Sequence, residues 1–255
     1  MRPEERRTLK VVFGIGAIAA LIPIAFVSFL FFLGSSVAPA PVAERAAAPP
    51  FVKDALWARA GGGRATELRM VNPISLAGLL LCSNLNGGGD NPDRLDGEDL
   101  AECAKWLPAL QGMEYLSNLH VRDHGVERNS FRGGAGAMAT MLRLSGSWTR
   151  DDFVNTLAAR ADFGYGWHGV EAAAQGFFDR PATALTLPEA AFLASRVGDT
   201  RTNPWCEPAA ATSMRNQVLE RMRTNGAIQE TDFQSASIAG LGLRSPREGR
   251  PPCPH

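Results

Sequence analysis

The sequence predicts a mainly α-helical fold, and three observations carry this expectation. Apolar residues recur at helical spacing, helix start signals precede several of these segments, and alternating strand patterns are nearly absent. With 26 basic and 26 acidic residues, the 255-residue chain has a formal net charge of zero. The chain therefore has no excess of basic residues that would suggest nucleic acid as a partner. The apolar fraction of 45% is enough for a sizeable core.

The first expected element is a stretch without charge over residues 11–33. A helix of this length, rising about 1.5 Å per residue, crosses a hydrocarbon core of roughly 30 Å. Four basic residues lie within residues 1–10, so the positive-inside rule keeps that end in the cytoplasm. We expect a single-pass anchor in the inner (cytoplasmic) membrane, with the rest of the chain on the outer, periplasmic side. A cleaved signal peptide is the alternative, although its apolar core usually runs about 7–15 residues.

Two segments read as irregular chain. Residues 34–50 are rich in Ala and Pro and have almost no large apolar side chains, which is typical of a linker. Residues 244–255 are similarly rich in Pro. The folded domain is then expected over residues 51–243.

Four cysteines gain meaning from the expected export of this domain. Cys82, Cys103, Cys206 and Cys253 form no close C-x-x-C pair, so a zinc site is not expected. An oxidising compartment favours two disulfides, for which three pairings are possible. We favour the local pairing, Cys82 with Cys103 and Cys206 with Cys253, because the second pair would fix the irregular tail to the domain.

The first helices of the folded part are expected over residues 74–81 and 95–110. A glycine-rich loop at residues 87–90 separates them. An apolar run supports the first segment, and apolar and charged residues at helical spacing support the second.

The later helices carry clearer boundaries. Thr186 can cap a helix, Glu189 completes a capping box, and Pro188 suits the first turn. A further helix begins at residues 207–208 and ends at Gly226. Its apolar face comprises Met214, Val218, Leu219 and Met222. A last short helix is expected over residues 231–239.

Two patterns could carry chemistry on their own. His120 and His124 are four residues apart, as in some metal sites, but no Glu lies between them, and ordinary surface histidines are the simpler interpretation. A glycine-rich segment at 133–136 follows Arg128 and Arg132. Such a loop can hold a phosphate with its backbone N–H groups, although it lacks the G-K-[ST] of a nucleotide loop and a plain turn is simpler.

Several ordered blocks from residue 149 onward identify a family. They read T-R-D-D-F at 149–153, F-G-Y-G at 163–166, G-V-E-A-A-A at 169–174 and L-T-L-P-E-A-A-F-L-A at 185–194. The pattern continues with N-P at 203–204 and with Arg215, Val218, Leu219, Met222, Gly226 and Ile228. This region of about ninety residues resembles the peptidoglycan glycosyltransferase domain of family 51. Class A penicillin-binding proteins and monofunctional transglycosylases carry that domain.

The resemblance implies a mainly helical, lysozyme-like fold with two lobes around a cleft, and an outward-facing single-pass anchor. It implies a reaction that joins lipid-linked disaccharide units. One glutamate acts as general base on the acceptor hydroxyl, and a second, with basic residues, assists departure of the lipid pyrophosphate. No cofactor and no metal are implied.

The segments expected to hold the catalytic residues depart from the family pattern. The first motif, E-D-x-x-F-x-x-H-x-G-x-D, aligns with residues 116–127 when Gly125 takes its glycine, which places Leu116 at the catalytic glutamate. Glu114 lies two residues off this register. The second motif, G-G-S-T-I-x-Q-Q-x-x-K-N, aligns with residues 133–144, where the two glycines remain and Arg143 replaces Lys. The third motif, R-K-x-x-E, has no counterpart around residues 145–148.

The candidate site follows from this comparison. Glu114 is the candidate catalytic carboxylate, reachable only after a local insertion. The candidate substrate-binding residues are Gly133, Gly134, Arg128, Arg132, Arg143 and His168. Glu171 and Glu189 are more simply structural residues of their helices.

Three functions remain open. The first is a catalytically degenerate, membrane-anchored protein that binds lipid-linked precursor, a glycan strand or a cell-wall synthesis protein. The second is a divergent transglycosylase that recruits Glu114 or another carboxylate, and the third is a structural envelope domain. The transpeptidase motifs are absent, so penicillin binding is not expected.

Overall fold

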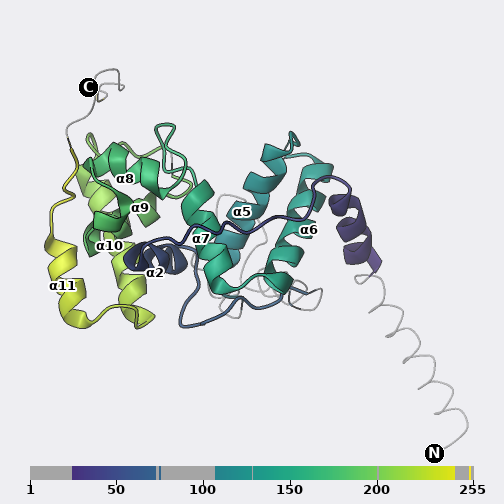
Figure 1. Ribbon diagram of the computed structural model, residues 1–255, viewed down its shortest axis with the longest axis horizontal. Helices are drawn as coiled ribbons and strands as arrows, with labels where there is room; N and C mark the ends of the chain where they lie inside the picture. Colours follow the sequence, from purple (N-terminus) through teal and green to yellow (C-terminus); the bar gives the residue numbers. More distant parts are fainter. Residues whose placement is uncertain are drawn as a thin grey trace, which may run out of the picture.

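The computed structural model describes residues 25–72, 75, 107–127, 129–199, 201–244 and 253. These residues are mainly helical, which confirms the predicted class (Figure 1). A helix covers residues 25–35, and the further elements are α2 (Pro50–Arg59), α5 (Leu110–Asp123), α6 (Phe131–Ser147), α7 (Arg150–Arg160), α8 (Val170–Phe178), η2 (Ala182–Ala184), α9 (Leu187–Arg196), α10 (Pro208–Thr224) and α11 (Glu230–Ile238). Among these residues, the β-type backbone pairing is limited to one isolated bridge between Asp162 and His168.

The helices form two groups. Helices α5 and α6 lie side by side at one end, next to the helix of residues 25–35, whereas α8 to α11 gather at the other end (Figure 1). Helix α2 lies between the groups and packs against α7, α9 and α10. Its residues Ala55 and Leu56 are fully buried, so the middle of the domain is organised around this short helix.

The predicted helix boundaries in the second group are confirmed. Thr186 caps α9, and the Glu189 carboxylate accepts hydrogen bonds from the Thr186 backbone N–H and hydroxyl at 2.8 Å each. Helix α10 begins at Pro208, and Gly226 follows its end with a φ of +78°. Glycine adopts this left-handed conformation without a steric cost. Helix α11 matches the expected last helix to within one residue.

The disulfide between Cys206 and Cys253 is present. It confirms one of the two favoured pairs. Cys82 and Cys103 lie outside the described residues, as do the expected helix over 74–81, the loop at 87–90 and most of the helix expected over 95–110.

The expected membrane anchor falls mostly on residues that the structure does not describe, because the description begins at residue 25. Within the described ranges, no helix has both the length and the apolar character that crossing a bilayer requires.

Residues 34–48, which we call the strap, require a correction to the predicted free linker. The strap lies along α6, α5 and α7 before the chain enters α2. The Glu44 N–H donates to Thr156 Oγ1 at 2.9 Å, and the Ala48 N–H donates to Asn155 Oδ1 at 3.0 Å. Such side-chain partners replace water for the strap backbone, so a segment with few apolar residues is nonetheless held on the domain.

The glycine-rich segment also differs from the expected loop or turn. Residues 133–136 lie in the first turns of α6, and Ser130 caps this helix by accepting the Gly133 N–H at 3.0 Å. The serine cap offsets the low helix propensity of the glycines.

Candidate functional site

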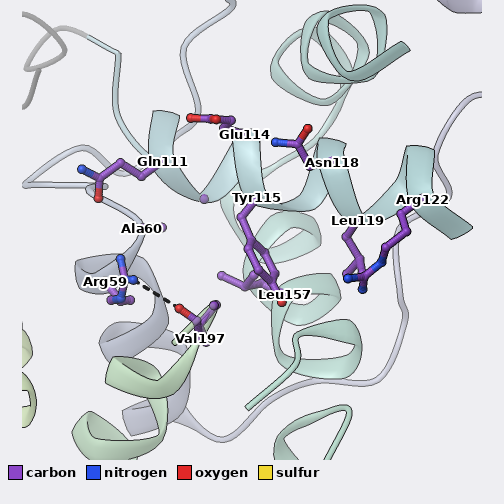
Figure 2. A pocket seen from close by; sticks show the side chains of 12 residues that line it. Arg59, Ala60, Gln111, Glu114, Tyr115, Asn118, Leu119, Arg122, Leu157 and Val197 are labelled. Carbon is purple, nitrogen blue, oxygen red and sulfur yellow. Dashed lines mark hydrogen bonds between the residues drawn. The ribbon is translucent and has the colours of Figure 1, made fainter. Parts of the chain in front are cut away.

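A cavity of about 470 Å³ opens beside α5. It lies between α5, the end of α2, α7 and the residues that follow α9 (Figure 2). Its lining comprises Arg59, Ala60, Gln111, Gly112, Glu114, Tyr115, Asn118, Leu119, Arg122, Leu157, Val197 and Gly198.

Helix α5 supplies most of the polar lining. Glu114, Asn118 and Arg122 follow one another at intervals of four residues, so they share one side of the helix. Figure 2 shows Glu114, Asn118 and Arg122 following one another along α5, with Tyr115 next to Leu157. One wall therefore offers a carboxylate, an amide and a guanidinium to a ligand.

Arg59 supplies a second cation from the last turn of α2. Its Nη2 donates to the carbonyl oxygen of Val197 at 3.2 Å, which holds the side chain across the cavity (Figure 2). Burial, and next the positive charge of Arg221, lower the pKa of Arg59, whereas Asp199 acts in the opposite direction. The guanidinium stays charged, and an anionic ligand would relieve this unfavourable environment.

Tyr115 is held in place by a residue that follows α7. Its hydroxyl oxygen accepts the Asp162 N–H at 2.9 Å. Burial raises the pKa of Tyr115, so the phenol remains neutral and can still donate its proton to an acceptor in the cavity.

The structure brings only one sequence-predicted site residue to this cavity, namely Glu114, which is solvent-exposed at its edge. Gly133, Gly134 and Arg132 lie in the first turns of α6 and do not line it. Arg128 lies outside the described residues.

Arg143 and His168 also lie elsewhere. Arg143 is 5.5 Å from the ring centre of Phe31, and its Nη1 donates to the Ala38 carbonyl at 3.3 Å. His168 is an exposed residue of the bridge to Asp162. The two residues therefore do not form one site with Glu114.

The segments that sequence comparison aligned with the family's catalytic motifs lie on α5, on α6 and at the connection between α6 and α7. Leu116, at the position of the first glutamate, is 4% exposed and faces the core. Helix α6 ends at Ser147 and α7 begins at Arg150, so only Trp148 and Thr149 connect them. Thr149 serves as the cap of α7, which leaves no chain there for the third motif.

His120 corrects a further expectation. It is 6% exposed rather than a surface residue, and only His124 beside it reaches solvent. Their ring centres are 4.5 Å apart. Within the described residues, no cluster of three or more His, Cys, Asp or Glu side chains is suited to a metal ion.

Sequence reasoning missed Arg59, Gln111, Tyr115, Asn118 and Arg122. The interval of four residues between Glu114, Asn118 and Arg122 was a usable signal once α5 was known to be a helix. Arg59 lies more than fifty residues upstream, and no sequence pattern links it to α5.

Comparison with known proteins finds a family match over part of the chain. Residues 114–223 match the family model described as "Transglycosylase". Over these residues the chain resembles a family 51 transglycosylase domain. The matched residues begin within α5, include Glu114, Asn118 and Arg122 of the cavity, and stop one residue before the end of α10.

The chain is similar to one part of longer curated proteins. "Penicillin-binding protein 1A" of Mycobacterium tuberculosis is 33% identical over 129 residues, which is 48% of this chain and 16% of that protein. The proteins of the same name from Mycolicibacterium smegmatis and Aquifex aeolicus are 30% and 40% identical, over 48% and 29% of this chain. These matches cover 16% and 10% of the two relatives. The chain thus matches only a small part of each relative's length.

Proposed function

We propose that this protein is a membrane-anchored, periplasmic transglycosylase-like protein that binds lipid-linked disaccharide precursor or a glycan strand without polymerising it. The observation that carries the proposal is the carboxylate content of the cavity. Glu114 is the only acidic residue among those that line it. The position of the first family glutamate holds the buried Leu116.

The chemistry of polymerisation supports this reading. Transfer of a sugar needs a base at the acceptor hydroxyl and positive charge or donors at the leaving pyrophosphate. The cavity offers cations in Arg59 and Arg122, but a single carboxylate at its edge. These groups suffice for recognition, because guanidinium groups bind phosphate oxygens and amides such as Asn118 bind sugar hydroxyls.

A divergent active transglycosylase is the second candidate, and the position of Glu114 favours it. The carboxylate lies on the same side of α5 as Asn118 and Arg122, so it could serve as the base for a bound acceptor. A filled cleft would favour a purely structural role, whereas a cavity of about 470 Å³ opens beside α5.

A polymerisation assay on the full-length chain in detergent separates these functions. The substrate is the lipid-linked disaccharide precursor, and precursor binding is measured in parallel. Glu114→Gln is compared with Glu67→Gln, a control at an exposed glutamate outside the cavity. We expect precursor binding and no glycan from the unmodified chain.

Glycan chains that disappear with Glu114→Gln, but not with Glu67→Gln, would overturn the proposal and make Glu114 the base. Glycan that is insensitive to both substitutions would point to another carboxylate. Neither glycan nor binding would leave the structural role.

A further inference from the structure

The strap covers a face of α5 and α6 that lies away from the cavity. Val37 packs against Gly136, and the Ala38 carbonyl accepts the Arg143 guanidinium. The Pro39 carbonyl lies 3.0 Å from His120 Nε2. His120 precedes Arg122 by two residues, about 200° around the helix, so strap and cavity use opposite sides of α5. Figure 1 shows the strap crossing these helices toward α2.

Small residues on both partners allow this close approach. A methyl group on Gly136 would lie 3.1 Å from a methyl carbon of Val37, and one on Gly34 would lie 2.0 Å from the Ala135 carbonyl oxygen. Any larger residue at Gly34 would therefore displace the strap from α6. The covered surface is fitted to this segment and to nothing bulkier.

The interface nevertheless contains polar atoms without partners. Among the described residues, His120 Nδ1, Ser117 Oγ and Ser35 Oγ are buried and make no hydrogen bond. Ser117 and His120 lie three residues apart on α5 and are 1% and 6% exposed. An unsatisfied buried polar atom destabilises the state that buries it. Because His120 contacts the strap through Nε2, detachment of the strap would let water reach its ring and relieve this penalty.

The geometry fixes the protonation state of His120. Because the Pro39 carbonyl can only accept, Nε2 carries the ring proton in the covered state, and Nδ1 is a bare lone pair. A second proton on Nδ1 would be buried with no acceptor. The strap between residues 34 and 41 holds no titratable side chain of its own.

The charged and titratable neighbours do not compensate for such a proton. His124 on α5 and Arg160 on α7 disfavour it, Asp123 favours it, and Arg160 already pairs with Asp123. On α6, Arg143 adds a further cation at the strap. Burial is the largest cause that lowers the pKa of His120 below its ordinary 6.5, and it outweighs the hydrogen bond to the Pro39 carbonyl, which acts in the opposite direction.

We propose that the strap is a detachable latch on α5 and α6, closed while His120 is neutral and released when His120 takes up a proton. The direction follows from linkage. The closed state disfavours the imidazolium, so closure is fully stable above about pH 6.5 and weakens as the pH falls through and below that value. The latch does not depend on the proposed binding function, since no ligand enters it.

Hydrogen exchange of the strap tests the latch. The full chain is exchanged at pH 7.5 and pH 5.5, and rates for peptides within residues 36–48 are corrected for the intrinsic effect of pH. We expect strong protection at pH 7.5 and a loss at pH 5.5. The loss is bounded at about tenfold per pH unit, the limit for one linked proton. Peptides of α9 should keep their protection.

His120→Gln is the decisive variant, because its amide can still donate to the Pro39 carbonyl but does not titrate. It should keep the strap protected at both pH values. His124→Gln is the matched control, on the exposed neighbouring ring, and should retain the pH effect. An equal pH effect in His120→Gln, or no pH effect in the unmodified chain, would overturn the proposal.

A covalent lock covers the case in which His120→Gln does not fold. The Cβ of Val37 lies 3.5 Å from the position of a Cβ on Gly136, within the range for a disulfide. The oxidised V37C/G136C variant should keep the strap protected at pH 5.5, and its reduced form should lose protection. Loss of protection in the locked form, or failure of the pair to join while V42C/G136C does, would refute the latch. Val42 is 80% exposed and serves as the control position.

Discussion

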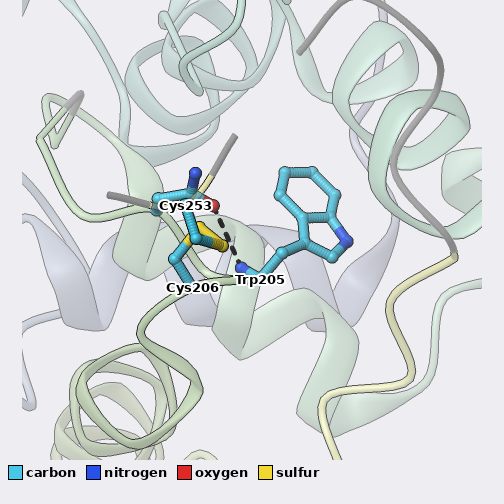
Figure 3. The surroundings of a disulfide bond; sticks show 4 residues. Trp205, Cys206 and Cys253 are labelled. Carbon is cyan, nitrogen blue, oxygen red and sulfur yellow. Dashed lines mark hydrogen bonds between the residues drawn. A yellow bond between two sulfur atoms is a disulfide. The ribbon is translucent and has the colours of Figure 1, made fainter. Parts of the chain in front are cut away.

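The two ends of the domain hold themselves together in different ways. In the group of α8 to α11, arginine side chains are fully buried and a disulfide fixes the tail. Arg215 is fully buried and donates to the carbonyls of Ser237, Ala239 and Gly240, and the Cys206–Cys253 disulfide lies beside Trp205 (Figure 3). At the other end, α5 and α6 meet the strap through a few hydrogen bonds from side chains to its backbone carbonyls, with no disulfide among the described residues there.

The difference separates parts of the domain that carry structure from parts that can change. The blocks that resemble the family are those of α7 to α10, where Phe153, Phe163, Phe177 and Phe192 are fully buried. The segments aligned with the family's catalytic motifs lie on α5 and α6, which the family match also covers, and small side chains of α6 face the strap. Large aromatic side chains thus fill one end of the domain, whereas small residues admit the strap at the other.

The largest expected effect comes from Arg215→Met. The substitution leaves the three carbonyls at the end of α11 without their donor, and an orphaned buried network costs about 3 kcal/mol. Urea unfolding measures this loss. Arg223→Met on the same helix is the control. Its pairs with Glu220 and Glu230 are exposed and screened by solvent, so their loss should change the stability little. Equal losses for the two variants would remove the contrast between the ends.

A smaller effect is expected for ligand binding through α5. Arg122→Gln should weaken binding of the lipid-linked precursor about tenfold, because one charge-assisted hydrogen bond to a phosphate is lost. Arg132→Gln removes an exposed arginine on α6 that does not line the cavity, so it should leave the dissociation constant unchanged. A titration with labelled precursor decides. Weaker binding for Arg132→Gln alone would place the ligand at the start of α6.

The smallest effect on stability is expected for Gly136→Leu. The new side chain meets Val37 and Val121. Because the strap can move aside, the free energy of unfolding should fall by less than the roughly 1–3 kcal/mol that overpacking of a rigid core costs. Faster hydrogen exchange at residues 36–48 is the sensitive readout. Gly134→Leu is matched in helix and residue type, and nothing lies near its Cβ position. It should leave the strap protected, and equal exchange in both variants would show that the strap does not rest on Gly136.

Local signals predicted the second group of helices well. The Thr186 and Glu189 capping box, Pro188 and Gly226 act within a few residues of the backbone that they fix. The tail was also predicted, because Cys206 is the cysteine nearest in sequence to Cys253.

The site and the strap depend on contacts that no local pattern encodes. Arg59 reaches the cavity through a hydrogen bond to Val197, 138 residues away in sequence. The strap is rich in Ala and Pro, and its hydrogen bonds to the domain use its backbone and side chains of the helices, such as Asn155 and Thr156. The glycines of α6 suggested a loop because their role, a close approach by Val37, lies in the partner segment.

The strap is synthesised before the helices that it contacts. Its hydrogen bonds join residues that are 81 to 112 positions apart. At about 5–20 residues per second, the strap leaves the ribosome roughly 4 to 22 seconds before its partners on α5, α6 and α7. Contacts of such high sequence separation form late, because the loop must close before they are rewarded. A segment that is made before most of the domain is therefore among the last to be placed.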